Sequence, residues 1–354
     1  MKSKPLHEID LPLKIVVGKG ILEKAGEYCA SLGLLGQVLV LTGPRVYSIA
    51  GKRVIDSLTD RGLEVQFYLV RSSTMSEVSK VRELIRGIKP QALVAVGGGK
   101  VIDVAKYSAY LEGIPFVSMP TSASHDGMAS PVASIRDEKG RPGSFFTRPP
   151  IAVLADVEVI ANAPYRLIAS GCGDVVAKVT AVRDARLARL LKGEYVGDYA
   201  LSLALLAAKL VMSKADLIAK RAEEGIRVLI EALISCGVAM AIAGSSRPCS
   251  GSEHLFSHAL DMIAPRPALH GEQVGVGTIM MAYLHGLRWK KIRDFLRKVG
   301  APVNAKELGI AEEYIIEALT VAHKVRRRYT ILGESGLTRK AAEELARVTG
   351  VIED

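Results

Sequence analysis

The sequence predicts two domains of different class, an N-terminal α/β domain followed by an all-α helical domain. Over the first 163 residues, short β-branched runs alternate with amphipathic segments, which is typical of parallel α/β units. From residue 164 onwards, strand patterns almost disappear and long helical patterns follow one another. We therefore expect domains at residues 1–163 and 164–354, with an active site in the cleft between them.

Six segments of the first domain have the apolar, β-branched composition of strands. Amphipathic segments between them, such as 21–32 and 76–89, predict right-handed crossovers and hence a Rossmann-like, doubly wound parallel sheet. Ligands of such sheets bind beyond the carboxyl ends of the strands. Residues 134–147 are rich in glycine and charge and predict a hairpin or loop. The predicted strands are 14–17, 37–42, 64–69, 92–96, 116–119 and 152–156.

The second domain contains six long helical patterns. Its most apolar stretches are interrupted by Lys209 and Glu231, which indicates core helices of a soluble protein rather than membrane spans. The N-terminus lacks the apolar region and cleavage site of an export signal, so we expect a cytoplasmic protein with no transmembrane span. The predicted helices are 181–191, 199–221, 224–243, 279–287, 289–299 and 311–322.

Composition limits the classes of function. The chain has 354 residues, 49% of them hydrophobic, so a large core can form without disulfides. Its four cysteines form no C-x-x-C pair, and we expect reduced, mostly buried thiols at Cys29, Cys172, Cys236 and Cys249. The net charge is +10, but Lys and Arg are spread along the chain. This distribution favours an anionic small substrate over a nucleic acid.

A glycine-rich turn is the first candidate binding element. The predicted strand 92–96 runs into Gly97, Gly98, Gly99 and Lys100, and a helical pattern begins at Val101. Glycines let the backbone approach a ligand closely, and the free N–H groups of a helix start attract phosphate, so a pyrophosphate fits here. The spacing matches neither G-x-G-x-x-G nor a P-loop, and a tight turn without a ligand remains an alternative.

The next strand ends in a loop of hydroxyl-bearing and small residues, 119–130, that includes Ser124, His125 and Asp126. These side chains are suited to hydrogen-bonding a cofactor or a sugar-like ligand. A plain serine-rich loop is the alternative.

Metal-ligating residues lie in the helical half. Asp174 ends the run Gly-Cys-Gly-Asp, His254 and His258 are four residues apart, and His270 precedes Gly-Glu-Gln. Residues four apart share a helix face, so His254 and His258 can point into one cavity. One carboxylate and two imidazoles are typical of a catalytic divalent site. Taken singly, Asp174 also fits a helix N-cap and the histidine pair also fits a surface or core, so spacing alone leaves the site open.

Together these motifs resemble the superfamily of iron-type alcohol dehydrogenases, glycerol dehydrogenase and dehydroquinate synthase, in the same order over essentially the whole chain. The motifs are 97–106, 120–124, 171–174, 252–261 and 270–275. Within that superfamily, the runs Thr-Ser-Ala-Ser-His-Asp-Gly and Glu-His-Leu-Phe-Ser-His-Ala-Leu-Asp look most like the archaeal sn-glycerol-1-phosphate dehydrogenases.

The resemblance implies a nicotinamide cofactor. The strand end at residues 41–45 has no acidic residue of the kind that repels a 2'-phosphate, so we expect both NAD(H) and NADP(H) to be accepted. The residues that the resemblance assigns to the cofactor are Gly97, Gly98, Gly99, Lys100, Val101, Thr121, Ser122 and Ser130.

The resemblance also implies a metal and a catalytic group. Asp174, His254 and His270 would bind one Zn²⁺ per subunit, although the superfamily also includes Fe²⁺ enzymes. Asp126 and His258 would contact the substrate, and we favour His258 as the proton relay over Asp126 or a metal-bound water.

The activity implied is the reversible reduction of dihydroxyacetone phosphate to sn-glycerol 1-phosphate, the backbone of archaeal membrane lipids, by a homo-oligomeric enzyme. Arg247, Arg266 and Lys178 lie beside the motifs and are candidates for binding the phosphate. Three alternatives remain: a glycerol dehydrogenase acting on the unphosphorylated compounds, a dehydroquinate-synthase-like lyase, and a non-catalytic nucleotide-binding protein on the same fold.

Overall fold

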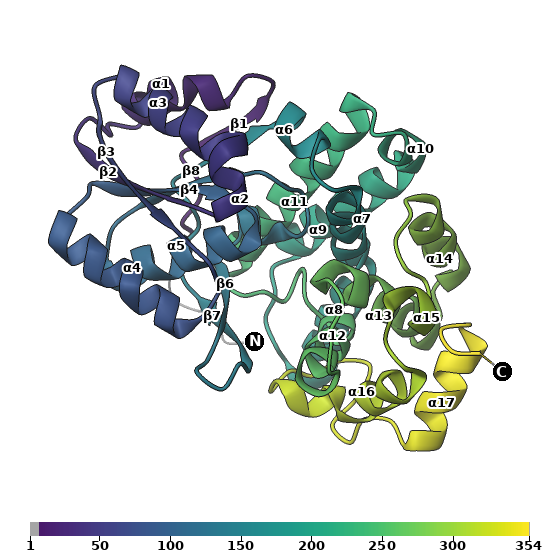
Figure 1. The fold of residues 1–354 in the computed structure, drawn as a ribbon. Helices are drawn as coiled ribbons and strands as arrows, with labels where there is room; N and C mark the ends of the chain where they lie inside the picture. Colours follow the sequence, from purple (N-terminus) through teal and green to yellow (C-terminus); the bar gives the residue numbers. More distant parts are fainter. Residues whose placement is uncertain (1–6, 354) are drawn as a thin grey trace. The chain divides into compact units, whose positions relative to one another are not determined.

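The structure, a computed structural model, describes residues 7–353, and the chain separates into two compact units (Figure 1). The first unit is Asp10–Tyr165. The second consists of residues 166–353 together with residues 7–9. The division therefore falls after Tyr165, close to the change of pattern after residue 163.

The first unit is built on a six-stranded sheet whose strand pairs are all parallel, in the order β1-β8-β5-β4-β2-β3. Each strand lies where the sequence predicts it, so the predicted α/β class is confirmed. The strands are β1 (Lys14–Gly18), β2 (Gln37–Thr42), β3 (Glu64–Leu69), β4 (Ala92–Gly97), β5 (Phe116–Pro120) and β8 (Ala152–Asp156).

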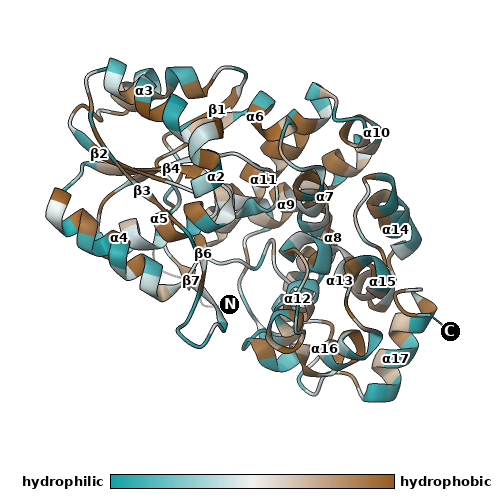
Figure 2. Ribbon diagram, in the orientation of Figure 1, coloured by the Kyte–Doolittle hydropathy of each residue, from teal (hydrophilic) through white to brown (hydrophobic). Residues whose placement is uncertain are grey.

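Helices cover both faces of this sheet (Figure 1). The helices α1 (Ala25–Ser31) and α3 (Lys52–Asp60) lie on one face, and α4 (Met75–Ile88) and α5 (Gly99–Glu112) lie on the other. Successive strand residues point to opposite faces, and β4 and all but the first residue of β2 are buried because both faces are covered; both strands are mostly apolar (Figure 2). The sheet is thus a rigid platform for the loops at its carboxyl edge.

Residues 132–146 form the hairpin that the sequence predicts, with β6 (Val132–Arg136) antiparallel to β7 (Pro142–Phe146). Short helical segments complete the unit: η1 (Leu22–Lys24), α2 (Pro44–Val46), η2 (Tyr47–Gly51), η3 (Asp126–Met128) and α6 (Val157–Ala161).

The second unit contains helices and no strand among its described residues, so the predicted all-α class is also confirmed. The helices are α7 (Tyr165–Val176), α8 (Lys178–Lys192), α9 (Asp198–Ser213), α10 (Ala215–Ala219), α11 (Glu223–Ala243), α12 (Ser252–Ile263), α13 (His270–Leu284), α14 (Trp289–Lys298), α15 (Ala305–Leu308), α16 (Glu312–Val325) and α17 (Arg339–Val348).

One predicted helix is wrong as a single element. The pattern 199–221 is divided at Lys214, whose backbone leaves the helical region at φ −106° and ψ 17°, so α9 and α10 are separate. The apolar spacing continues through the break because both helices bury a face in the same unit. Hydrophobic periodicity reports burial, and it does not detect an interruption of a single residue.

Two apolar features of the chain are buried. Among the described residues, α11 is the helix long and apolar enough to cross a membrane, but 61% of its most apolar window is buried within the protein, as in a core helix. The four cysteines are buried thiols that form no disulfide, as expected from their spacing. Burial raises the pKa of the Cys29 thiol to about 12 and raises that of Cys172 further.

Candidate metal and cofactor sites

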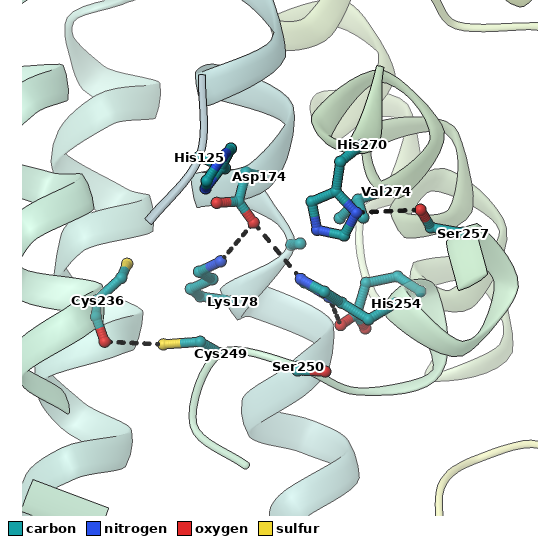
Figure 3. Close-up of polar contacts among 12 residues, drawn as sticks. His125, Asp174, Lys178, Cys236, Cys249, Ser250, His254, Ser257, His270 and Val274 are labelled. Carbon is teal, nitrogen blue, oxygen red and sulfur yellow. Dashed lines mark hydrogen bonds and ion pairs between the residues drawn. The ribbon is translucent and has the colours of Figure 1, made fainter. Parts of the chain in front are cut away.

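Three predicted ligands converge in the helical unit. Asp174 comes from α7, His254 from α12, and His270 is the first residue of α13 (Figure 3). One ligand atom from each lies within 4.8 Å of the others. A carboxylate oxygen and two imidazole nitrogens form a donor set that suits a divalent ion of borderline softness. The residues therefore fit a metal centre, and Asp174 lies within its helix rather than at an N-cap.

Glycine residues allow these helices to approach. A Cβ built on Gly173 would lie 2.1 Å from the carbonyl oxygen of Gly271, and one built on Gly271 would lie 1.9 Å from that of Ser170. Neither position tolerates a side chain without separation of α7 and α13. Because Asp174 follows Gly173 and His270 precedes Gly271, the same close approach brings these two candidate ligands together.

Neighbouring groups orient the two imidazoles. Nδ1 of His254 lies 2.8 Å from the Glu253 carboxylate, while its Nε2 lies 3.5 Å from Asp174 Oδ1. Nδ1 of His270 lies 3.3 Å from the Ser257 hydroxyl (Figure 3). A metal-ligating histidine ordinarily donates its other ring N–H to such a partner, which fixes the tautomer. The Glu253 contact thus leaves Nε2 of His254 for the metal, and the Ser257 contact has the same effect on His270.

Glu253 is itself held in place. Its carboxylate is buried and accepts hydrogen bonds from the Gly251 N–H at 2.6 Å and the Thr180 hydroxyl at 2.7 Å. Burial alone raises its pKa, but the contacts with His254 outweigh burial and lower it, so the carboxylate stays charged. The sequence analysis missed Glu253. Its position directly before His254 in the sequence was the one feature that could have pointed to it as a partner of that imidazole.

Asp174 is paired with a buried lysine. Lys178 Nζ lies 2.8 Å from Asp174 Oδ1, one turn along the chain, and both side chains are almost fully buried. Burial raises the pKa of Asp174, but the Lys178 ammonium and the His254 imidazole outweigh it and hold the pKa well below its usual range. Asp174 is therefore an anionic candidate ligand at any ordinary pH. Lys178, considered from sequence as a phosphate contact, instead faces this carboxylate.

His258 lies beside the ligands on the same face of α12, as the spacing predicts. Its ring stacks on that of His270, with centroids 5.7 Å apart. The His254 and His270 rings meet edge to face, with centroids 5.1 Å apart. Its Nε2 is 3.0 Å from Arg326 Nη2, and its Nδ1 is 3.8 Å from Asp261. Burial, reinforced by the charge of Arg326 and opposed by Asp261, lowers the pKa of His258 to about 4. The imidazole is therefore neutral at pH 7.

The glycine turn lies in the α/β unit at the carboxyl end of β4. Gly98 is the residue before α5 and supplies no side-chain cap, and its carbonyl accepts the Val101 N–H at 3.0 Å, so the N–H groups that a ligand would meet first are those of Gly99 and Lys100. Thr121 continues from β5 beside it and donates its N–H to the Gly97 carbonyl at 3.1 Å. A Cβ on Gly98 would meet only the Ser122 hydroxyl, at 3.3 Å. Thr121, Ser122 and the glycine turn therefore form one local surface.

The loop after β5 is held by hydrogen bonds from a buried lysine that the sequence analysis missed. Lys106 of α5 is buried and donates to the carbonyls of Gly127 and Val132, both at 2.7 Å, beside Asp103 at 3.5 Å. Asp126 begins η3 within this loop, and its charge acts on Lys106. Ser130 is buried and its hydroxyl lies against the Val132 backbone. The helix that begins at the glycine turn therefore also holds the segment carrying Asp126 and Ser130.

Comparison with known proteins identifies the relatives of this chain. It is 53% identical to the glycerol-1-phosphate dehydrogenase [NAD(P)+] of Thermococcus sibiricus, over 98% of this chain and 99% of that protein. It is 54% identical to the protein of that name from Methanothermobacter thermautotrophicus, over 98% and 99%.

This chain belongs to the glycerol-1-phosphate dehydrogenase family.

Other comparisons agree with that assignment and confirm the resemblance inferred from the motifs. Residues 16–164 match the family described as iron-containing alcohol dehydrogenase. The crystal structure of glycerol dehydrogenase from Schizosaccharomyces pombe has the same fold, with a TM-score of 0.80, 22% identity, and coverage of 99% of this chain and 92% of that one.

Replacement of Gly98 by valine tests the cofactor turn. Because only the movable Ser122 hydroxyl borders the new Cβ, we expect the variant to fold, whereas its side chain would fill the space that a phosphate needs. Losing one or two charge-assisted hydrogen bonds should raise the KM for NADH and NADPH by about 10- to 100-fold. Steady-state kinetics would measure this change. An unaltered KM for both cofactors would contradict the assignment.

The substitution Gly271→Ala tests the approach of α7 and α13. The new Cβ would lie 1.9 Å from the Ser170 carbonyl oxygen, so the helices must move apart. We expect a loss of about 1–3 kcal/mol in unfolding free energy and a protein purified with little metal. The control is Gly87→Ala on α4, where a Cβ meets nothing within 4 Å and stability should hold or rise. Full metal content in Gly271→Ala would refute this role.

The buried His258 predicts a dependence of stability on pH. Its pKa is about 4 in the folded protein, against an ordinary imidazole pKa of 6.5, so between these values the unfolded chain binds more protons. Its contribution is complete above about pH 6.5 and decreases by up to about 1.4 kcal/mol per pH unit as the pH falls towards 4.

Urea denaturation of metal-free protein and of the His258→Gln variant, at several pH values from 4.5 to 7.5, measures that contribution. The slope of stability against pH should be steeper in the parent protein. Parallel slopes would show that His258 does not titrate in this way.

Proposed function

We propose that this chain reduces dihydroxyacetone phosphate to sn-glycerol 1-phosphate with NADH or NADPH, and that the reaction is reversible. The observation that carries the proposal is the convergence of Asp174, His254 and His270 in a chain that shares more than half its residues with glycerol-1-phosphate dehydrogenases. An ion held at this position would be surrounded by groups that pair with or orient the three residues: Lys178, Glu253 and Ser257.

Asp174, His254 and His270 would hold one Zn²⁺, with Fe²⁺ as the alternative ion. When bound, the metal polarises the ketone oxygen and the nicotinamide supplies hydride to the carbonyl carbon. The protein residues prepare this chemistry. Glu253 and Ser257 fix the two imidazoles, and Asp174 contributes negative charge that it keeps because Lys178 and His254 hold its pKa down.

A proton must reach the ketone oxygen as it is reduced. His258 is the proposed relay, because it is neutral at pH 7 and its ring lies against the ligand His270. The Asp261 carboxylate faces Nδ1, which favours the tautomer with the proton on that nitrogen. Asp126 is the second proposed substrate contact. The hydrogen bonds that Lys106 donates to the carbonyls of Gly127 and Val132 support a fixed position for the loop that carries Asp126.

The cofactor assignment follows the same reasoning. Gly97, Gly98, Gly99, Lys100 and Val101 are proposed to bind the pyrophosphate at the start of α5, where the backbone is uncapped. Thr121 and Ser122 border that turn, and Ser130 is proposed as a further contact from the loop that Lys106 holds.

We further propose a homo-oligomer that works in the cytoplasm and supplies the glycerophosphate backbone of membrane lipids. Support for self-association comes from α9, where Tyr199, Leu206 and Leu210 lie on one face and are 73%, 51% and 48% exposed. Exposed apolar faces of this kind mark association surfaces. The archaeal origin of the similar glycerol-1-phosphate dehydrogenases supports the pathway.

Two variants and two substrates test the proposal. His270→Ala removes a ligand and should abolish turnover together with bound metal, whereas His258→Ala should retain metal and lower kcat by about 100-fold. Metal analysis and steady-state kinetics measure both. Equal metal content in the two variants would show that the roles are misassigned.

The substrate is tested on the parent enzyme with dihydroxyacetone phosphate and dihydroxyacetone. A strong preference for the phosphorylated ketone and a product of sn-glycerol 1-phosphate configuration are expected. Preference for the unphosphorylated ketone would make the protein a glycerol dehydrogenase. Ketone consumption without net formation of NAD(P)+ would indicate a lyase.

A further inference from the structure

We propose that Asp184 is a positioning residue of the metal centre, and that it holds His254 in place by fixing the start of α12 to α8. This inference rests on the proposed function, because it concerns the metal ligands of that function. Asp184 lies in α8, outside every motif that the sequence analysis singled out. Its side chain is fully buried, and its carboxylate contacts four donors from three segments of the helical unit.

One oxygen of this carboxylate caps helix α12. Gly251, the residue before the helix, has no side chain with which to cap it. Asp184 Oδ2 instead accepts hydrogen bonds from the backbone N–H and the hydroxyl of Ser252, both at 2.6 Å. A carboxylate at this end of a helix binds an N–H group that has no partner within the helix, and it interacts favourably with the helix dipole. The turn that carries Glu253 and His254 is thereby tied to α8.

Helix α8 holds the same turn at a second point. Thr180 lies four residues before Asp184, so both side chains share one face of α8. The Thr180 hydroxyl donates to Glu253 Oε2 at 2.7 Å, and Glu253 Oε1 lies 2.8 Å from Nδ1 of His254. This face of α8 therefore fixes both the backbone of the turn and the carboxylate that orients the imidazole.

The backbone at residue 251 lies directly against α8. A Cβ built on Gly251 would lie 2.5 Å from Asp184 Oδ2 and 2.8 Å from the Cα of Ala181. No side chain fits there unless one of the two segments moves. Because the approach is this close, a group at position 184 that repels the Ser252 N–H must push the turn away from α8.

The other oxygen keeps the carboxylate in one orientation. Asp184 Oδ1 accepts a hydrogen bond from the Ile331 N–H at 2.7 Å and lies 3.0 Å from Nε2 of His285, the C-cap residue of α13. A carboxylate has about four acceptor positions, and the four donors around Asp184 occupy them. The group cannot turn without losing hydrogen bonds, so Oδ2 stays directed at Ser252.

Other contacts hold the segment that precedes α12. Arg328 donates to the Ser250 carbonyl and, at 2.7 Å, to the Ser246 hydroxyl. Arg247, which the sequence analysis considered as a phosphate contact, is paired with the Glu194 carboxylate at 2.6 Å. Loss of the carboxylate from α8 is therefore expected to displace the first turn of α12 while the helical unit stays folded.

Such a displacement would be felt at the metal. Ligand atoms must be held within about 0.5 Å of the required geometry, and loss of a group that orients a ligand typically weakens metal binding by about 10- to 100-fold. Nε2 of His254 lies 3.5 Å from Asp174 Oδ1 across the site. Movement of α12 would change this spacing directly, because His254 lies in its first turn.

The test compares Asp184→Asn with Asp156→Asn, a matched control in the α/β unit. Asp156 is also buried, and its two oxygens accept from the N–H groups of Ile21, Leu22, Glu158 and Val159. In both aspartates each oxygen faces a backbone N–H, so the new amide group would meet a donor in either orientation. Both metal-free variants should therefore unfold at a lower urea concentration than the parent protein.

Metal affinity separates the two variants. Co²⁺ serves as the probe in place of Zn²⁺, because its visible absorption reports both the amount bound and the geometry of the ligands. Titration of the metal-free protein without urea should give a Kd about 10- to 100-fold higher for Asp184→Asn than for the parent, with altered absorption bands. Asp156→Asn should bind Co²⁺ as the parent does.

Ser252→Ala changes the same contact more mildly. It removes the hydroxyl that donates to Asp184 and keeps the backbone N–H, so the protein should fold. Its Kd for Co²⁺ should rise by about 3- to 10-fold, as expected for the loss of one hydrogen bond. This variant tests the inference even if Asp184→Asn yields no folded protein.

The outcomes are distinguishable. Equal Co²⁺ affinity in the parent, Asp184→Asn and Ser252→Ala would overturn the inference. Weakening of the same size in Asp184→Asn and Asp156→Asn would also overturn it, because lower stability alone would then explain the effect. A parent protein that binds no Co²⁺ would contradict the proposed metal centre and the inference together. A parent that binds Co²⁺ without reducing dihydroxyacetone phosphate would contradict the proposed function, while the Kd values would still decide the role of Asp184.

Discussion

The backbone contact between α7 and α13 is the constraint on which the candidate metal centre depends. Hydrogen atoms at Gly173 and Gly271 occupy positions where any side chain would overlap a carbonyl oxygen of the opposite helix. Asp174 and His270 are the adjoining residues, so the spacing of the ligands is set by main-chain packing rather than by flexible side chains. Preorganisation of this kind places the cost of assembling the ligands on folding instead of on binding.

Around that contact, neighbouring groups keep each candidate ligand in the protonation state that can bind a cation: an ionised carboxylate or a neutral imidazole. The Lys178 ammonium keeps Asp174 ionised, and the Glu253 carboxylate accepts a hydrogen bond from the His254 ring. Buried charges like these are costly unless they are paired, and here each is paired with a group that also has a part in the site. In the α/β unit, Lys106 has a comparable part, since it links the helix of the glycine turn to the loop that carries Asp126.

The fold was largely predictable from sequence, because strand composition and helical periodicity both reflect burial, and β2 and β4 are buried on both faces. The break at Lys214 was not, since it leaves the apolar pattern intact. The proposed ligands Asp174, His254 and His270 came from motif resemblance, and in the structure one potential ligand atom of each lies within 4.8 Å of the others. Spacing along the chain could not reveal the contacts of Glu253 or the direction of Lys178, because these depend on which helices pack together.

The burial of Cys172 has a practical consequence for studying this protein. The thiol sits in α7 two residues before Asp174, and burial raises its pKa, so almost no reactive thiolate exists in the folded state. Alkylating reagents can reach it only when α7 separates from its neighbours. The rate of its modification would thus report on transient opening of the helix that carries Asp174, through a cysteine that the chain already contains.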